Sequence, residues 1–203
     1  YERRGTDILF DVRLLQLCRK HYTTMLDMGA GYGTESIMAG IMGYTVIAIE
    51  RSSRRIEEIN RRKVEYEKEF GRLDITTLHE LYERCCQESD IIMFKRSFYF
   101  NNSNPGQEVF STCRTCLAPD GLIIINGIDT FEGSNTNTLL RGNGFSTISW
   151  QSGKTERRRI ENNKSPIRTA PFITLASPKA FSPQFLTEVE HCIKLHHPVF
   201  KRP

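Results

Sequence analysis

Short apolar runs alternate along the chain with longer segments in which apolar residues recur every three or four positions. The first pattern is typical of buried β-strands and the second of amphipathic helices. We expect strands at residues 24–28, 45–50, 69–73, 90–94, 122–126, 145–150 and 172–176. We expect helices at residues 7–21, 34–42, 53–68, 78–87, 105–117, 137–143 and 183–195.

This alternation predicts the fold class. Strands separated by helices pair in parallel, whereas the last two strands are joined by a loop alone and are expected to pair antiparallel. The sequence therefore predicts an α/β fold: a doubly wound, mostly parallel seven-stranded sheet with an antiparallel last strand and helices on both faces. We expect one domain over residues 1–203, with a core at 7–177 and a C-terminal extension at 178–203. Because the chain begins at Tyr1, we expect a processed product or a piece of a longer protein.

Local signals mark where individual elements begin and end. Thr34 is expected to cap the second helix, and Ser52 or Ser53 the third. Residues 119–121, Pro-Asp-Gly, are expected to form a turn before the fifth strand.

Composition places the chain among ordinary globular proteins. Hydrophobic residues make up 38% and charged residues 26%, with a mean hydropathy of −0.42. No apolar run approaches the roughly 18 residues of a membrane span, and no signal-peptide pattern is present, so we expect no membrane association. The six cysteines include the adjacent Cys85 and Cys86 and are interpreted as reduced thiols, which predicts an intracellular and cytoplasmic location. Cys113-x-x-Cys116 lies mid-helix without a second pair at zinc-site spacing, so we expect core thiols and no metal.

The most informative stretch joins the first two strands. Asp27 is expected at the end of a strand, after which Gly29, Gly31 and Gly33 turn the chain into a helix. Glycine allows positive φ and close approach of a ligand, and ligands of open α/β sheets bind beyond the carboxyl ends of the strands. Glu50 ends the second strand, where a carboxylate can accept hydrogen bonds from two ribose hydroxyls.

The spacing of the glycines separates the possible cofactors. A dinucleotide site has the pattern Gly-x-Gly-x-x-Gly, whereas this loop has Gly29-x-Gly31-x-Gly33. Asp27 at the mouth of the turn would repel a pyrophosphate, which seeks a helix N-terminus. S-adenosylmethionine has no phosphate and carries an ammonium, a carboxylate and a sulfonium, so its cationic end suits Asp27.

These motifs match one known family. Asp27-Met28-Gly29-Ala30-Gly31-Tyr32-Gly33-Thr34 resembles the first motif of the class I S-adenosylmethionine-dependent methyltransferases. Glu50 resembles the family's acidic residue after the second strand, and Asp74-Ile75 resembles its third motif, whose acid meets the adenine amino group. Later segments resembling the family's fourth strand, turn into strand five, approach to strand six and strand seven lie at 89–93, 117–124, 139–145 and 172–177. The resemblance covers residues 7–177.

The resemblance implies an enzyme that uses S-adenosylmethionine and releases S-adenosylhomocysteine. The implied cofactor-binding residues are Asp27, Gly29, Ala30, Gly31, Gly33, Glu50, Arg51, Asp74 and Ile75. The alternatives are that Asp27 is a helix cap, that Glu50 is a surface acid and that Asp74 caps the next segment. His79 either lines the adenine pocket or is a surface or capping residue.

In this family the residues after the fourth strand line the methyl-transfer site. Here they are Lys95, Arg96, Ser97, Phe98, Tyr99 and Phe100. Lys95 and Tyr99 are the catalytic candidates on the acceptor side. The signatures of adenine or glutamine amino-group, cytosine-C5, protein arginine and cap ribose methylation are all missing. A basic, aromatic segment can stack on and clamp a nucleotide, although Phe98 and Phe100 could instead be core and Lys95 solvated.

Positive charge gathers late in the chain. The basic residues of segment 151–168 are Lys154, Arg157, Arg158, Arg159, Lys164 and Arg168. Such a cluster can attract an anionic partner or be a solvated loop. With the segment after strand four, it slightly favours RNA or a nucleotide as methyl acceptor. Two other interpretations stay open: a non-catalytic scaffold that keeps the methyltransferase fold, and an NAD-type oxidoreductase.

Overall fold

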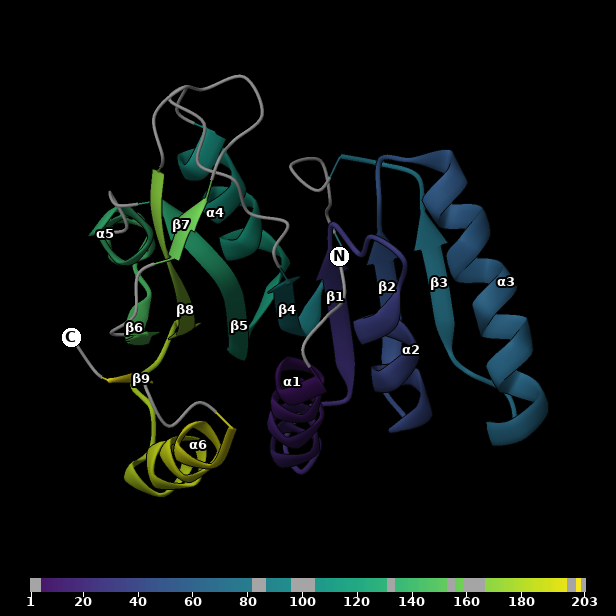
Figure 1. The fold of residues 1–203 in the computed structure, drawn as a ribbon, viewed down its shortest axis with the longest axis horizontal. Helices are drawn as coiled ribbons and strands as arrows, with labels where there is room; N and C mark the ends of the chain where they lie inside the picture. The colour runs from purple at the N-terminus through teal and green to yellow at the C-terminus, as the bar shows by residue number, and fades with distance from the viewer. Residues whose placement is uncertain are drawn as a thin grey trace.

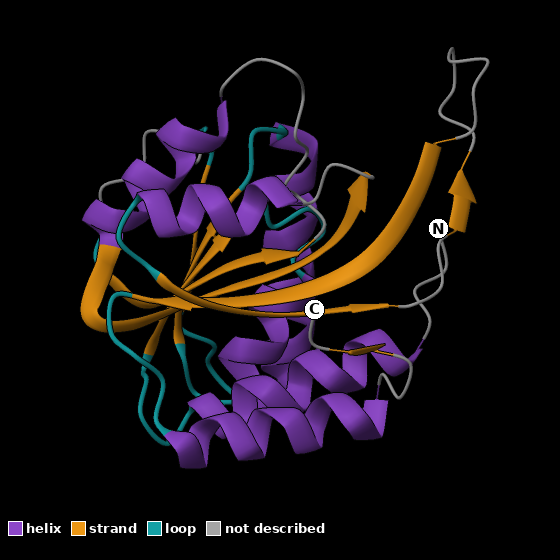
Figure 2. Ribbon diagram, turned by 90° about the vertical axis from the view of Figure 1, so that its left-hand side faces the viewer, coloured by secondary structure: helices purple, strands orange, loops and turns teal. Residues whose placement is uncertain are grey.

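The computed structural model describes residues 5–81, 87–95, 105–130, 134–152, 156–158, 167–196 and 200–201. They form one twisted sheet covered by helices on both faces, which is seen edge-on in Figure 2. No helix in these ranges combines the length and the apolar character that crossing a bilayer requires.

Within the described residues the sheet has nine strands, ordered β3-β2-β1-β4-β5-β8-β6-β9, with β7 beside β8 (Figure 1). The strands are β1 Thr24–Met28, β2 Thr45–Ile49, β3 Ile75–Leu78, β4 Ser89–Lys95, β5 Leu117–Thr130, β6 Ser146–Ser152, β7 Glu156–Arg158, β8 Ile167–Ser177 and β9 Phe200–Lys201. Strands β3, β2, β1, β4 and β5 pair in parallel, whereas β8 is antiparallel to both β5 and β6. The predicted α/β class and the antiparallel late strand are confirmed. The short strands β7 and β9 extend the predicted seven.

Six helices are described. They are α1 Gly5–Cys18, α2 Thr34–Ile41, α3 Ser53–Phe70, α4 Pro105–Cys116, α5 Ser134–Gly142 and α6 Pro183–His196. Side chains from α1, α2, α3 and α6 enter one apolar cluster, and those from α4 and α5 enter a second. The two sets of helices therefore cover opposite faces of the sheet.

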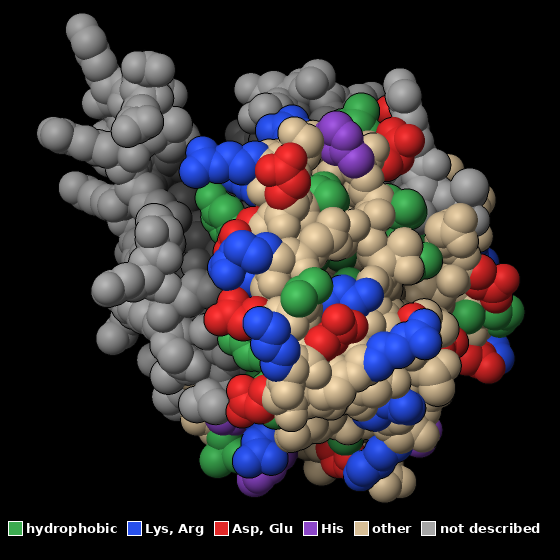
Figure 3. All heavy atoms as spheres, turned by 90° about the vertical axis from the view of Figure 1, so that its right-hand side faces the viewer, with side chains coloured by type: hydrophobic (Ala, Val, Ile, Leu, Met, Phe, Trp, Pro, Cys, Tyr) green, Lys and Arg blue, Asp and Glu red, His purple; other side chains and the backbone are tan. Residues whose placement is uncertain are grey.

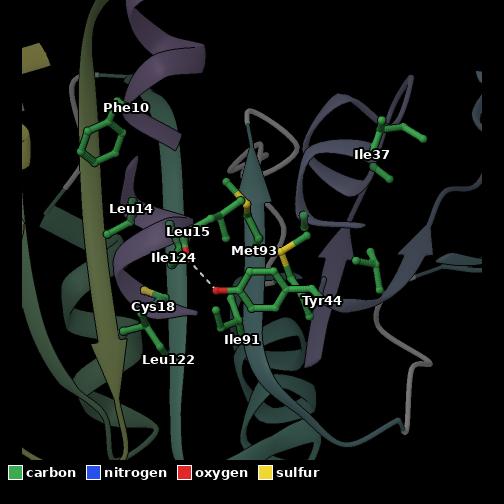
Figure 4. Packing of buried hydrophobic residues seen from close by; sticks show 14 of the residues in the cluster. Phe10, Leu14, Leu15, Cys18, Ile37, Tyr44, Ile91, Met93, Leu122 and Ile124 are labelled. Carbon is green, nitrogen blue, oxygen red and sulfur yellow. Dashed lines mark hydrogen bonds between the residues drawn. The ribbon is translucent and has the colours of Figure 1, made fainter. Parts of the chain in front are cut away.

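The core follows from the alternation of side chains along each strand. Met25, Ala48 and Met93 face the first cluster, whereas their neighbours Leu26 and Phe94 face the second. Figure 4 shows the first cluster around Tyr44, whose hydroxyl donates to the carbonyl oxygen of Leu15 at 2.7 Å. Burying each large apolar side chain contributes about 1.5–3 kcal/mol to the free energy of folding, so both faces of the sheet are firmly fixed.

Helix α3 lies along the β3 edge of the sheet and is mostly solvated. Figure 3 shows this edge, where Lys and Arg side chains are interspersed with Asp and Glu. Arg61 donates to Glu58 at 2.8 Å and to Glu65 at 3.1 Å, spacings that support an exposed helix. The alternating charges explain how a helix with a single fully buried residue, Ile59, remains well formed.

The third strand was predicted in the wrong place. Helix α3 continues to Phe70 and ends at Gly71, whose φ of 81° suits glycine. The strand forms instead at Ile75–Leu78, where β-branched residues fit a pleated surface. The helix expected from residue 78 cannot begin there, because Leu78 ends β3. Its residues 82–86 lie outside the described residues.

Two local predictions also differ. The N-cap of α2 is Gly33, in a left-handed conformation, and not Thr34, whereas Ser52 is the N-cap of α3 as predicted, without a side-chain hydrogen bond. The expected Pro-Asp-Gly turn is an irregularity inside β5, where the register against β4 shifts. A Cβ at Gly121 would lie 2.8 Å from the carbonyl oxygen of Asp90, so this close approach of two strands requires glycine.

The predicted C-terminal extension packs on the same core. In α6, Val189 and Ile193 are buried in the first cluster, which also contains Phe10 and Leu14 of α1. Strand β9 pairs with β6. The described residues of 178–203 therefore pack on and pair with the preceding elements.

Candidate cofactor-binding site

Four polar side chains end the apolar face of the sheet that α1 and α2 cover. Each lies two residues beyond a core residue on the same strand face: Asp27 after Met25, Glu50 after Ala48, Lys95 after Met93 and Asn126 after Ile124. Asp27, Glu50 and Lys95 lie at or next to the carboxyl ends of β1, β2 and β4, and Asn126 of β5 is the register partner of Lys95. All four are buried. This edge is where open α/β sheets bind ligands, so the polar row marks the candidate site.

The loop after β1 is shaped by three glycines. Gly29, Gly31 and Gly33 have φ values of 74°, 59° and 71°, a region that other residues rarely adopt. The amides of Gly29 and Ala30 both donate to the carbonyl oxygen of Ile49 at 2.9 Å. These bonds fix the loop against the end of β2, so the ends of β1 and β2 form one unit.

Gly31 and Gly33 have different surroundings. A Cβ at Gly33 would lie 2.8 Å from Cγ1 of the buried Ile59, so this glycine is required by packing against α3. A Cβ at Gly31 would meet no atom within 4 Å. Gly31 therefore faces open space at the tip of the loop, where a ligand can approach the backbone.

Glu50 is tied to the loop. It is only 3% exposed and accepts from the amide of Gly31 at 2.9 Å and from that of Ser52 at 3.1 Å. Arg55 reaches the same carboxylate at 3.5 Å and lies over the Tyr32 ring, 5.6 Å from its centroid. A carboxylate has about four lone-pair positions, so a ribose diol would fill the remaining capacity or replace Arg55.

Asp27 is the most deeply placed acid of the predicted motif. Its side chain is 1% exposed, and Ser36 Oγ donates to Oδ2 at 2.5 Å. Ser36 belongs to α2, directly after the glycine loop. The carboxylate is therefore held beneath the loop by the helix that the loop leads into.

Asp74 and Ile75 lie at the opposite end of the sheet, and the structure removes them from the site. Ile75 pairs with Val46, and Asp74 accepts from Thr45 Oγ1 at 2.7 Å, both at the amino end of β2. The third motif was misplaced because β3 begins, and does not end, at this point.

The carboxyl end of β3 carries different residues. Leu78 pairs with Ile49, and its carbonyl oxygen accepts from the amide of Glu50 at 3.1 Å. His79 Nε2 lies 2.8 Å from the carbonyl oxygen of Arg51, a predicted site residue. His79, which sequence reasoning left open, is thus brought beside the end of β2.

Sequence reasoning missed Asp11, which sits on α1 and is fully buried. Its Oδ2 accepts from Lys95 Nζ at 2.5 Å, and its Oδ1 accepts from Asn126 Nδ2 at 3.1 Å. Burial raises the pKa of Asp11 to about 6, against the lowering effect of Lys95. The sequence offers one signal for Asp11, because an acid between the apolar residues Phe10 and Val12 can indicate a buried functional group.

Several predicted residues lie outside the described ranges. These are the segment 96–100 with Tyr99, and Lys154, Arg159 and Lys164. Arg157 of β7 and Arg168 of β8 are backbone partners, with Arg158 the next residue of β7. The acceptor side of the site and the basic segment therefore remain predictions.

Among the described residues, no cysteine forms a disulfide. Cys113 and Cys116 are buried in the second cluster, as expected for core residues of α4. Within the described ranges, no group of three or more His, Cys, Asp or Glu is arranged to hold a metal ion.

The sequence matches no protein-family model and no curated protein. Solved structures do resemble this fold. The ribosomal protein L11 methylase of Lactobacillus delbrueckii subsp. bulgaricus matches with a TM-score of 0.61 and 18% identity, over 87% of this chain and 81% of that one. The magnesium protoporphyrin IX methyltransferase of Synechocystis PCC 6803, solved with bound S-adenosylmethionine, matches with a TM-score of 0.62 and 13% identity, over 85% and 79%. The precorrin-6y C5,15-methyltransferase of Geobacter metallireducens GS-15 matches with a TM-score of 0.58 and 16% identity, over 82% and 86%.

These likenesses span most of each chain. The chain has the fold of the class I S-adenosylmethionine-dependent methyltransferases.

Proposed function

We propose that the protein is an S-adenosylmethionine-dependent methyltransferase. The observation that carries this proposal is that two acids, Asp27 and Glu50, lie beside a loop of three positive-φ glycines. Both acids are at the carboxyl ends of neighbouring strands. A fold is shared by proteins of many functions, so the argument rests on these residues and not on the likeness alone.

The charge of the site supports a cationic ligand. Among the described residues, the buried acids are Asp11, Asp27, Glu35 and Glu50, and the one buried base is Lys95. An acid at the glycine loop suits the cationic methionine end of a ligand, whereas it would repel a pyrophosphate. S-adenosylmethionine carries one net positive charge, whereas the pyrophosphate of a dinucleotide is negative.

Each residue has a proposed role toward the cofactor. When bound, the cofactor supplies a methyl group on a sulfonium for in-line displacement by the acceptor. Asp27 balances the cationic methionine end, Gly31 lets the backbone approach the ligand, and Glu50 accepts from the ribose hydroxyls. His79 at the end of β3 takes the adenine side in place of Asp74. The contribution of these residues to catalysis is alignment of donor and acceptor.

The acceptor is proposed from charge alone. The three matched proteins are named for a ribosomal protein, a magnesium porphyrin and a precorrin, so they suggest no common acceptor. The basic segment 151–168 favours RNA or a nucleotide, with Tyr99 as a candidate on the acceptor side.

Calorimetric titration of the purified chain tests the proposal. We expect S-adenosylmethionine and S-adenosylhomocysteine to bind in the micromolar range and NAD to give no heat. Binding of NAD alone would support the oxidoreductase interpretation, and heat from none of the three would refute the proposal.

Transfer is tested separately with methyl-labelled S-adenosylmethionine and pools of RNA, nucleotides and protein. Label in the RNA or nucleotide pool is expected. Cofactor binding without label in any pool would identify a non-catalytic scaffold.

A further inference from the structure

Lys95 is a buried cation whose hydrogen-bonding capacity is only partly used. Its side chain is 3% exposed, and an ammonium has three N–H donors. Within the described residues, the ammonium makes a single hydrogen bond, to Asp11. Buried polar groups in native proteins are nearly always satisfied, so the remaining donors call for an acceptor that a ligand would bring.

The head of Lys95 is held in place from two elements. Asp11 reaches it from α1, and Asn126 fixes the other oxygen of Asp11 from β5. Asn126 is also the register partner of Lys95 across the β4–β5 pair. The ammonium is therefore anchored at the carboxyl end of β4 and cannot turn away without breaking this set of contacts.

Lys95 and Asp27 lie close together on the same face of the sheet. Asp27 is the register partner of Met93, and Lys95 is two residues further along β4. Two residues of a strand span about 6.6 Å, and neighbouring strands lie about 4.8 Å apart. A buried acid and a buried base thus stand on one face of the sheet at the ends of the neighbouring strands β1 and β4, an arrangement that suits a ligand carrying both charges.

We propose that Lys95 donates to the carboxylate of S-adenosylmethionine, while Asp27 faces its ammonium, and that Asp11 is the positioning residue for Lys95. This inference rests on the proposed function and assigns a carboxylate partner that the glycine loop and Glu50 leave unassigned. It also moves Lys95 from the acceptor side, where the sequence placed it, to the cofactor side. Because Lys95 is almost fully buried, the contact forms only with a local rearrangement around it.

The test compares S-adenosylmethionine with its decarboxylated form, which keeps the sulfonium, the amine and the adenosine. Loss of the carboxylate makes the ligand more cationic, so the excess of buried acids alone would strengthen binding. If Lys95 binds the carboxylate, the wild-type protein instead binds the decarboxylated form about 10- to 100-fold more weakly, as for loss of a charge-assisted hydrogen bond.

Variants locate the effect. In Lys95→Met, which keeps a similar volume, we expect the two ligands to bind within about twofold of each other, since the discriminating charge is gone. Asp11→Asn should reduce the ratio without changing affinity for the decarboxylated form. The matched control is Lys63→Met on α3, where Lys63 donates to the carbonyl oxygen of Ile75 away from the site, and it should keep the wild-type ratio.

Each outcome decides the inference. A wild-type protein that binds both ligands equally overturns it without any variant, as does a Lys95→Met protein that keeps the wild-type ratio. A Lys95→Met protein that binds cofactor normally but needs more acceptor would return Lys95 to the acceptor side and also overturn it. If the wild-type protein binds neither ligand, the proposed function fails, and that result is distinct from a failure of this inference.

Discussion

The two ends of the parallel strands both carry acids, but in opposite settings. At the amino end, Asp90 accepts from the amides and hydroxyls of both Thr23 and Thr24 at 2.8–3.1 Å. At the carboxyl end, Asp27 and Glu50 are buried beneath a glycine loop with open space at its tip. Asp90 is held by the residues that begin the neighbouring strand, whereas Asp27 and Glu50 are held by the glycine loop and the helices around it, next to open space at Gly31.

The pKa values follow the same division. Partial burial alone would raise the pKa of Asp90, but its hydrogen bonds together outweigh burial and lower it. For Asp11, burial dominates and raises the pKa to about 6, even with Lys95 in contact. The residue type alone therefore does not show whether a carboxylate at the end of a strand belongs to a ligand site. Its burial and its hydrogen-bond partners decide this.

The largest expected effect comes from making the same substitution, Asp to Asn, at each end of the parallel strands and comparing cofactor affinity. Asp27→Asn removes a buried charge that faces the proposed ammonium, so we expect cofactor affinity to fall about 100-fold in calorimetry. Asp74→Asn, at the amino end, should change affinity less than twofold. Equal losses in the two variants would mean that the carboxyl end is not the binding edge.

Alanine at two glycines sharpens the comparison within the loop. Gly33→Ala adds a Cβ 2.8 Å from Ile59 at a positive φ, so we expect about 2–4 kcal/mol loss of unfolding free energy in urea denaturation. Gly31→Ala should cost only about 1–2 kcal/mol, because its Cβ meets nothing. Gly31→Ala should nevertheless weaken cofactor binding, and unchanged affinity there would contradict a ligand at the loop tip.

Asp90→Asn should affect stability and not binding. The loss of charge-assisted hydrogen bonds at the amino end predicts about 2 kcal/mol lower unfolding free energy at pH 7, with cofactor affinity unchanged. Because the pKa of Asp90 is lowered in the folded state, its contribution is present above the unfolded pKa and is lost as pH falls through the folded value. The difference between wild type and variant should therefore vanish on acidification, and a constant difference would contradict the electrostatic origin.

A pH dependence of opposite sign is expected at Asp11. Its pKa is raised on folding from 3.8 to about 6, so the folded state binds a proton more tightly than the unfolded state. Stability from this group is present below pH 4 and is lost as pH rises to about 6. Wild type compared with Asp11→Asn, which cannot ionise there, should lose stability across this window. If the free energy of unfolding of the wild type instead increased with pH relative to that of Asp11→Asn, the assignment would be contradicted.

Much of the fold was predictable because the spacing of apolar residues along the chain indicates most of its strands and helices. The strands at residues 24–28 and 90–94 are apolar runs of the right length, and the glycine loop after Asp27 has few alternative conformations. Strand β3 was misplaced because α3 is held by surface ion pairs and so lacks the wide apolar stripe that would have marked its end. Asp11 was missed because its role depends on Lys95 and Asn126, contacts that no local pattern encodes.

The contacts of Asp11 also bear on how the molecule is made. They join a residue of the first helix to partners 84 and 115 positions later in the chain. During synthesis from the N-terminus, α1 and the glycine loop emerge well before β4 and β5, so the nascent chain holds an acid whose counter-charge does not yet exist. The proposed carboxylate site can therefore be complete only once β5 has joined the sheet, which places its formation late in folding.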